Sequence, residues 1–398
     1  MAELVTIEEA LALVLAHSSR LPPETVPLAG AAGRYLAAPA LAASDLPPFA
    51  SSAMDGFAIQ CADVPGRLAI VARIAAGRPA ARSLGRGEAM EISTGGVVPD
   101  GADTVVPIEN VVVTDDTVAV GVPLATGSNV RPQGGDIAAG AEVVPPGRPL
   151  GPSQLAALAA AGVTEVRCGT RPRVAILATG TELKPPGSRL QPGEIYESNG
   201  LMLDAALRAS GVVVERLDAV PDDEDAHRQA LAHGLVADVL VTSGGVSVGP
   251  HDLVRRLAGE LGVTEVFWGV AMRPGKPLSF GVRGQTLVFG LPGNPVSALV
   301  GCELFVRPAV RALQGADDPH PPFERGTLGE ELRRSPARDD LVRARVERSP
   351  DGAVVLRPVV GQESHMIARA ALADALVHVP RGDGAIAAGS PVRYLRLA

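Results

Sequence analysis

Three acidic residues in the second half of the chain could hold a metal ion. Glu182, Asp222 and Asp252 each lie in a loop that follows a short apolar run. Short apolar runs that alternate with helical stretches predict a parallel sheet, and ligands bind at the carboxyl ends of its strands. In proteins Mg²⁺ is bound by a few carboxylates together with phosphate oxygens and water. We therefore expect Glu182, Asp222 and Asp252 to act as catalytic residues and to bind Mg²⁺.

Asp252 alone has a simpler explanation. It is expected in the first turn of a helix, where a carboxylate interacts favourably with the helix dipole. Two further carboxylates at the same edge of the sheet favour the metal site over this explanation.

A glycine-rich loop spans residues 242–252, with the sequence TSGGVSVGPHD. Its glycines permit positive φ angles and close backbone approach, so its N–H groups can converge on a phosphate. The spacing matches neither the P-loop nor the Rossmann glycine pattern, which disfavours a nucleoside triphosphatase and a dinucleotide-dependent dehydrogenase. The residues expected to contact an anionic substrate are Ser243, Gly244, Gly245, Ser247 and Gly249.

The turn at residues 272–277, MRPGKP, carries two cations, Arg273 and Lys276. Taken alone it is best explained as an ordinary exposed turn. In the company of a phosphate site it could instead bind a small tetrahedral oxyanion.

Other catalytic chemistries find little support in the sequence. The seven histidines form no H-E-x-x-H motif, and the three cysteines form no C-x-x-C pair. Ser243 and Ser247 lack the G-x-S-x-G context of a hydrolase nucleophile.

The composition restricts the class of protein. The 398 residues are 46% hydrophobic, which supports folded cores, and they are too many for one compact core. A net charge of −8 and only 3% aromatic residues disfavour a general nucleic-acid or anionic-membrane surface. No apolar run reaches the length of a membrane span and no leader pattern begins the chain, so we expect a cytoplasmic protein without nucleic-acid or membrane partners.

The elements that must position these residues follow from local patterns. Thr6–Glu9 predicts a capping box that opens a helix to about residue 18. Short alternating runs over residues 21–149 predict β-rich structure, and Ser153 is expected to cap a short helix. Alternating strands and helices follow over residues 172–313, the last helix running from Pro295 with Asn294 as its cap. Short strands with Pro-Gly turns predict a β-barrel at the C-terminus.

The motifs together resemble the molybdopterin molybdenumtransferase family, of the bacterial MoeA type related to the C-terminal domain of gephyrin. The matching segments occur in the same order across nearly the whole chain. They are SAMDGFA at 52–58, ISTG at 92–95, GADTVV at 101–106, VR at 130–131, GDI at 135–137, ATGTEL at 178–183, SN at 198–199, residues 243–252, PGKP at 274–277, residues 290–297, and Gln362 with Ser364.

The resemblance implies a multidomain α/β plus β fold and an elongated homodimer. It predicts a discontinuous linking domain (1–45 with 131–170), a β-rich lid domain (46–130), an α/β domain resembling molybdopterin adenylyltransferase (171–316) and a C-terminal β-barrel (323–398). The implied reaction inserts molybdenum from molybdate into adenylyl-molybdopterin and releases AMP, with Mg²⁺ assisting pyrophosphate cleavage.

The resemblance also implies roles for particular residues. Glu182, Asp222 and Asp252 match acidic residues around the pyrophosphate and metal. Asp55 and Thr94 match catalytic residues that reach the cleft, from the other subunit. The residues at positions used for molybdate are Arg273, Lys276, Arg343 and Ser364. Many relatives have Lys at position 273, and Arg345 could take the place assigned to Arg343.

Two other functions remain open. The α/β domain alone would also fit a molybdopterin adenylyltransferase, but the Asp55 and Thr94 motifs and the barrel disfavour it. A gephyrin-like scaffold would not need the three carboxylates. Such an adenylyltransferase could still be a partner that hands over the substrate, and residue types do not separate molybdate from tungstate.

Overall fold

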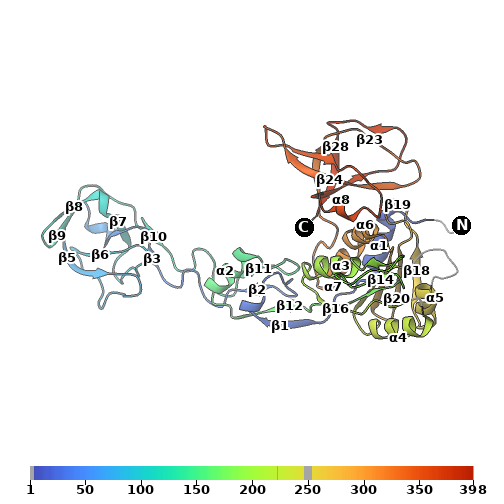
Figure 1. Ribbon diagram of the computed structural model, residues 1–398. Helices are drawn as coiled ribbons and strands as arrows, with labels where there is room; N and C mark the ends of the chain where they lie inside the picture. The colour runs from blue at the N-terminus through green and yellow to red at the C-terminus, as the bar shows by residue number, and fades with distance from the viewer. Residues whose placement is uncertain (1–3, 222, 246–252, 398) are drawn as a thin grey trace.

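The computed structural model of the protein describes residues 4–221, 223–245 and 253–397. Figure 1 shows an elongated molecule with a small β-rich lobe at one end, which a narrow segment joins to a larger body. We call this lobe the lid, and its first and last strands lie at residues 51–52 and 130–131. The body contains an α/β domain with a β-barrel beside it, above it in the view of Figure 1.

Six strands form the sheet of the α/β domain in the order β16-β13-β17-β21-β20-β18. The first four strands are parallel to one another, and β20 pairs antiparallel with both β21 and β18, which confirms the predicted mostly parallel sheet. All five residues of β17 are buried, as expected for a strand covered on both faces. The strands are β13 (Arg173–Ala178), β16 (Val213–Arg216), β17 (Val239–Ser243), β18 (Thr264–Trp268), β20 (Ser279–Arg283) and β21 (Thr286–Leu291).

Helices cover both faces of this sheet and enclose two cores. On one face Leu231 and Leu257 pack with Leu240, and on the other Val14 and Leu203 pack with Val241. The first face is covered by α4 (Glu224–Gly234) and α5 (Leu253–Glu260). The second is covered by α1 (Ile7–His17), α3 (Asn199–Arg208), α6 (Pro295–Gly301) and α7 (Arg307–Leu313).

The capping box predicted for the first helix is confirmed. Thr6 Oγ1 accepts a hydrogen bond from the Glu9 N–H at 3.1 Å, and Glu9 Oε2 accepts one from the Thr6 N–H at 2.8 Å. Two of the otherwise unpaired backbone groups at this helix end are thereby satisfied.

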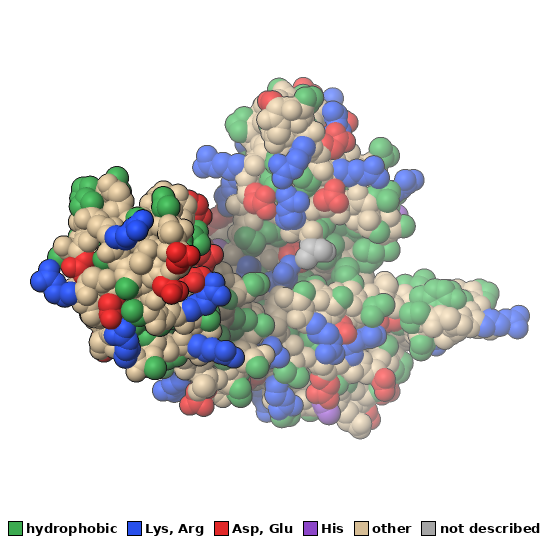
Figure 2. Space-filling view, turned by 90° about the vertical axis from the view of Figure 1, so that its left-hand side faces the viewer, with side chains coloured by type: hydrophobic (Ala, Val, Ile, Leu, Met, Phe, Trp, Pro, Cys, Tyr) green, Lys and Arg blue, Asp and Glu red, His purple; other side chains and the backbone are tan. Residues whose placement is uncertain are grey.

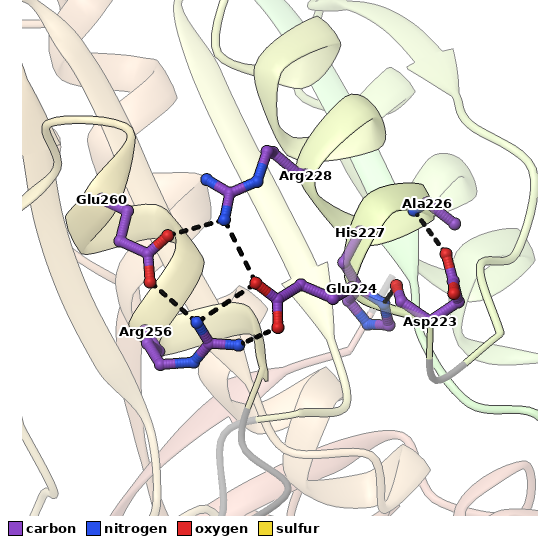
Figure 3. A network of polar contacts seen from close by, with 7 residues as sticks. All are labelled: Asp223, Glu224, Ala226, His227, Arg228, Arg256 and Glu260. Carbon is purple, nitrogen blue, oxygen red and sulfur yellow. Dashed lines mark hydrogen bonds and ion pairs between the residues drawn. The ribbon is translucent and has the colours of Figure 1, made fainter.

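A ring of four charges joins α4 to α5 (Figure 3). Arg228 Nη2 donates to Glu224 at 3.2 Å and to Glu260 at 2.7 Å, and Arg256 donates to the same two carboxylates at 2.6 and 2.8 Å. The hydrogen bonds from Arg256 to Glu224 and from Arg228 to Glu260 lower the pKa of both carboxyl groups. The ring links the first half of α4 to α5 and holds the two helices together on one face of the sheet.

The single helix expected over residues 295–313 is interrupted. Its helical path passes through a π-helical turn, η4 (Cys302–Val306), between α6 and α7. Pro308 lies in the first turn of α7, where it cannot donate a hydrogen bond and its ring would clash with the carbonyl four residues earlier in a regular helix. A widened turn directly before the proline relieves this clash.

The lid contains a six-stranded sheet in the order β7-β4-β6-β5-β9-β8. Its strands are β4 (Gly56–Ile59), β5 (Gly66–Ile74), β6 (Glu88–Ile92), β7 (Thr104–Pro107), β8 (Val111–Thr114) and β9 (Thr117–Val120). The chain enters through β3 (Ser51–Ser52) and leaves through β10 (Val130–Arg131), which pair with each other. The predicted β-rich character of this region is confirmed.

The narrow segment is built from the two stretches of chain on either side of the lid. The strand β1 (Pro23–Pro27) pairs with β12 (Glu165–Gly169), and β2 (Ala40–Leu41) pairs with β11 (Glu142–Val144). The helix α2 (Pro152–Ala160) packs beside them.

The expected cap of α2 is wrong. Gly151 is the N-cap residue and provides no side chain, while Ser153 Oγ donates to Gln154 Oε1 at 3.0 Å. Pro152 is suited to the first helical position, so the helix starts before Ser153.

The C-terminal region forms a closed β-barrel, as predicted. Five strands pair in a ring because β24 contacts both β25 and β26. They are β22 (Phe323–Leu328), β24 (Asp339–Arg348), β25 (Val354–Pro358), β26 (Ala375–Val379) and β28 (Pro391–Arg396). The short strand β19 (Met272–Arg273) of the α/β domain pairs in parallel with β24 and so attaches the barrel to that domain.

Among the helices of the described residues, none combines the length and the apolar character that crossing a membrane requires. On the face shown in Figure 2, acidic and basic side chains are interspersed over the lid, the barrel and the α/β domain.

Candidate active site

A cavity of about 710 Å³ lies at the carboxyl ends of β13, β17 and β21. This is the edge of the sheet at which the alternation of strands and helices predicts ligand binding, and we call this cavity the first pocket. The loops that follow these three strands line it, and two of them contain predicted site residues. The lining includes Thr179, Gly180, Glu182, Asn199, Ser243, Gly244, Gly245, Pro292, Gly293 and Asn294.

The glycines of this pocket are required by close packing of its loops. Gly244 and Gly245 have φ angles of +99° and +64°, in the region that favours glycine. A Cβ on Gly244 would lie 2.6 Å from the Thr179 carbonyl oxygen, and one on Gly245 would lie 2.5 Å from Val254 Cγ2. The loop after β17 therefore comes too close to its neighbours for any larger residue, which leaves backbone at the pocket wall.

Glu182 is exposed and lines the first pocket. Its carboxylate lies beside Gly180, since a Cβ built on Gly180 would be 2.5 Å from Glu182 Oε2. The other residues predicted for this end of the sheet, namely Asp222, Ser247, Gly249 and Asp252, lie outside the described residues. Within the described ranges, no three His, Cys, Asp or Glu side chains gather as a metal site would require.

A second pocket of about 550 Å³ adjoins the first, and the two share the lining residues Pro277, Pro292, Asn294 and His365. The cationic residues that line it are Arg273, Lys276 and Arg338, and Ser364 and Glu363 contribute from the barrel side. The predicted turn residues Arg273 and Lys276 therefore meet Ser364, which is almost ninety residues away in sequence.

The three cations of the second pocket differ in their partners. Arg273 forms a bidentate ion pair with Asp340, at 2.9 Å from Nε to Oδ1 and 2.5 Å from Nη2 to Oδ2. Asp340 is buried and Arg273 is its partner, so the guanidinium of Arg273 is already engaged by a carboxylate. Within the described part of the chain, neither Lys276 nor Arg338 has an ion-pair partner. An anion in this pocket would therefore interact mainly with Lys276 and Arg338.

Asp55 and Thr94 lie together in the lid. The antiparallel register that pairs Gly56 with Ile92 brings them side by side. Asp55 Oδ1 accepts hydrogen bonds from the Thr94 N–H at 2.6 Å and from Thr94 Oγ1 at 2.9 Å, and these bonds lower the pKa of the Asp55 carboxyl group. Within one chain the lid extends away from the α/β domain, so the pair does not lie at either pocket of its own chain (Figure 1).

Comparisons with known proteins cover nearly the whole chain. Residues 5–162 match the MoeA N-terminal region (domain I and II), residues 175–312 a probable molybdopterin binding domain, and residues 325–397 the MoeA C-terminal region (domain IV). Molybdopterin molybdenumtransferase 2 from Mycobacterium tuberculosis is 35% identical over 386 residues, covering 93% of this chain and 94% of that protein.

The chain belongs to the MoeA family.

Further relatives agree with this assignment. A molybdopterin molybdenumtransferase from Staphylococcus aureus is 32% identical over 396 residues, covering 98% of this chain and 94% of that protein. Two crystal structures of a MoeA protein from Pyrococcus horikoshii are 30% and 27% identical, with TM-scores of 0.84 and 0.86. Each covers 99% of this chain, and this chain covers 99% and 100% of them.

In this MoeA chain Arg343 lies behind the second pocket and does not line it. Its side chain is 1% exposed and donates to the carbonyl oxygens of Met366, Gly361 and Glu363 at 2.8, 2.7 and 3.2 Å. These carbonyls belong to the loop that presents Ser364. Arg345, the alternative, is exposed and donates to the Leu372 carbonyl.

Asn294 does not act as the predicted helix cap. It makes no capping hydrogen bond, and its Nδ2 donates to Ser364 Oγ at 3.0 Å. The Val296 N–H, at the start of α6, donates to the Ser364 carbonyl at 3.1 Å. The Ser364 carbonyl therefore supplies the acceptor that a capping side chain would have supplied. These two hydrogen bonds attach the barrel loop to the α/β domain between the two pockets.

Sequence reasoning missed two residues of this MoeA site. Arg338 lies at the second pocket because β24, which it precedes, pairs with β19, and no local pattern predicts that pairing. Asn199 belongs to the matching segment SN at 198–199 but was not predicted as a site residue, and it links two loops of the first pocket. One signal in the sequence could have indicated Asn199 as a site residue: it begins the helix that follows the loop after β13.

Replacing Arg343 with lysine is expected to lower the free energy of unfolding by about 1–3 kcal/mol, because a lysine cannot reach all three buried carbonyls. The molybdate concentration needed for half-maximal activity should also rise, since Ser364 lies in the loop that would lose its hydrogen bonds to Arg343. Denaturant unfolding and activity titrations measure both effects. Arg345→Lys, on the same strand, is the control. A loss of molybdate response with unchanged stability would instead support direct anion binding by Arg343.

Proposed function

We propose that this chain inserts molybdenum from molybdate into adenylyl-molybdopterin, with release of AMP, in the biosynthesis of the molybdenum cofactor. Its membership of the MoeA family supports the transferase activity. The observation that carries the particular substrates is the pair of adjoining pockets, one walled by glycine loops and one lined by cations.

The first pocket would hold the phosphate-bearing part of the substrate. Part of its wall is the backbone of Gly244 and Gly245, and its floor is the carboxyl end of the parallel strands, where phosphates bind in such folds. The second pocket would hold molybdate, whose oxygens accept hydrogen bonds from Lys276, Arg338 and Ser364. With a net charge of −8, the protein needs such local cationic groups to bind an anion.

The first pocket fits a magnesium ion that arrives with the substrate. Mg²⁺ takes a few carboxylates from the protein and completes its shell with phosphate oxygens and water. Glu182 provides a carboxylate at the pocket, and Asp222 and Asp252 are proposed to join it. When bound, the ion would offset negative charge that develops on the pyrophosphate oxygens.

The lid would complete the cleft of a second subunit. Asp55 and Thr94 form a preorganised pair, yet they lie away from both pockets of their own chain. We propose a homodimer in which the lid domain (46–130) of each chain is held out by the linking domain (1–45 with 131–170) toward the partner's α/β domain (171–316) and barrel (323–398).

Mixing two inactive variants is expected to restore activity if the cleft is shared. In a mixture of Asp55→Ala and Glu182→Gln chains, random pairing makes half the dimers mixed, and each mixed dimer has one intact cleft. The expected rate of AMP release is about a quarter of that of the wild type. Mixing under conditions that prevent subunit exchange is the control. Full activity in a monomer at sedimentation equilibrium would contradict the proposal.

The direct test of the function is incubation of the full chain with adenylyl-molybdopterin, Mg²⁺ and molybdate, with AMP followed by chromatography. Molybdate-dependent AMP release is the expected result. Formation of adenylyl-molybdopterin and pyrophosphate from ATP and molybdopterin would indicate an adenylyltransferase instead. No turnover in either assay would favour a scaffold. Stimulation by an added molybdopterin adenylyltransferase would support a handover contact, and a parallel titration with tungstate tests the choice of anion.

A further inference from the structure

Asn199 joins two loops at the wall of the first pocket. It is the first residue of α3, lines the pocket, and is only 9% exposed. Its Nδ2 donates to Ser243 Oγ at 2.8 Å and to the Gly293 carbonyl oxygen at 2.7 Å. Ser243 ends β17 and is 3% exposed. One amide group therefore connects the loops that follow β17 and β21.

These contacts determine the direction of the hydrogen bonds. The carbonyl oxygen of Gly293 can only accept, so the amide nitrogen of Asn199 must face it. The second N–H of that nitrogen is directed at Ser243 Oγ, which therefore accepts. The hydroxyl proton of Ser243 is left for another acceptor, and among the described residues no acceptor receives it.

The remaining atom of the amide is also unpaired. Asn199 Oδ1 is buried and has no hydrogen-bond partner among the described residues. A buried polar atom without a partner is uncommon and costs stability. Because Oδ1 only accepts, a phosphate oxygen cannot satisfy it, and its partner in the occupied pocket would have to be a donor such as a water molecule bound with the substrate.

We propose that Asn199 is a positioning residue that holds Ser243 as a hydrogen-bond donor to a phosphate oxygen of the substrate. A phosphate oxygen only accepts, which suits a hydroxyl whose lone pair is already engaged. Gly244 and Gly245 follow directly and add no side chain of their own to the pocket wall. The inference rests on the proposed function for the identity of the substrate, and on the pocket alone for the phosphate.

The test measures binding of inorganic pyrophosphate with Mg²⁺ to the full chain by isothermal titration calorimetry. Ser243→Ala should weaken binding about tenfold to a hundredfold, the effect of losing one hydrogen bond to a charged group. Asn199→Asp has nearly the same shape, but its carboxylate only accepts, so Ser243 must turn its proton toward it. This variant should weaken binding at least as much as Ser243→Ala does.

The decisive measurement is the double variant. If Asn199 acts through Ser243, adding Ser243→Ala to Asn199→Asp should cause no further loss of affinity. If the loss of pyrophosphate affinity in the double variant equals the product of the two single losses, the proposal is overturned, because each residue then acts separately. Unchanged affinity in Ser243→Ala, or no pyrophosphate binding by the wild type at millimolar concentration, would also overturn it. Asn110→Asp, an exposed position in the lid, controls for the added charge.

A second substitution protects the test against misfolding. If Asn199→Asp does not fold, Asn199→Ala takes its place, since it frees Ser243 to donate to the Gly293 carbonyl. Adding Ser243→Ala to Asn199→Ala should then cause no further loss of pyrophosphate affinity. The two proposals can fail separately. If the double variant binds pyrophosphate no more weakly than Asn199→Asp, but the wild type releases no AMP from adenylyl-molybdopterin, only the proposed function is contradicted. If the wild type releases AMP, but the two substitutions weaken pyrophosphate binding independently, only the role of Asn199 is contradicted.

Discussion

Replacing Glu182 with glutamine is expected to reduce AMP release by at least about a hundredfold. The substitution keeps the size of the side chain and removes an exposed carboxylate that lines the first pocket. The other described carboxylate there, Glu197, already accepts a hydrogen bond from the Gly200 N–H and pairs with Arg216. Loss of a charge that stabilises a metal ion at the cleaved phosphate costs several kcal/mol of transition-state stabilisation. Because Glu182 is exposed, the melting temperature should stay close to that of the wild type. Steady-state rates across a Mg²⁺ titration and thermal melts measure both quantities.

The chain offers a matched control in the same segment. Glu194 accepts a hydrogen bond from the Gln191 N–H and pairs with Lys184, but it does not line the pocket. Glu194→Gln should therefore turn over normally with an ordinary Mg²⁺ requirement. The metal proposal would be contradicted if Glu182→Gln behaved in the same way.

Asp252→Asn tests the second proposed Mg²⁺ ligand in the same way, at a position outside the described residues. A first-turn carboxylate that only interacts with the helix dipole contributes about 0.3–1 kcal/mol to stability and nothing specific to turnover. A metal ligand at this position would instead lower the rate by orders of magnitude and raise the Mg²⁺ requirement. An earlier melt with near-normal turnover would favour the helix-end explanation.

Truncating Lys276 to alanine should raise the molybdate concentration needed for half-maximal activity about tenfold to a hundredfold. Lys276 has no ion-pair partner among the described residues, so its full charge is available to an anion in the second pocket. Loss of one charged hydrogen bond costs about 1.5–3 kcal/mol, which corresponds to this range. The affinity for adenylyl-molybdopterin should change little. Titrating molybdate at saturating adenylyl-molybdopterin measures the effect.

Arg273→Ala gives the contrasting result within the same turn. The bidentate pair with Asp340 already engages Arg273, so its removal should affect molybdate less than the loss of Lys276 does. It should destabilise the protein more, because the buried Asp340 carboxylate loses its partner. An unchanged molybdate dependence in Lys276→Ala would place the anion elsewhere.

The domain types and the edge of the sheet that holds the site could be predicted from the sequence. The alternation of apolar runs and helical stretches over residues 172–313 predicts a parallel sheet, and that topology alone places the loop of Gly244 and Gly245 at a pocket. The capping box at Thr6 and Glu9 is likewise correct, because both of its hydrogen bonds join residues three positions apart. Patterns of this kind depend on neighbours within one helical turn or along one strand.

Only the tertiary structure decided which distant groups meet. Asn294 and Ser153 carry the right side chains for helix caps, yet Asn294 contacts Ser364 in the barrel and Ser153 follows a helix start set by Pro152. Arg343 was expected at the anion, but the barrel buries it against three loop carbonyls. These outcomes share one physical cause. A hydrogen-bonding side chain has several possible partners, and the choice among them depends on which strands pair and which loops pack together.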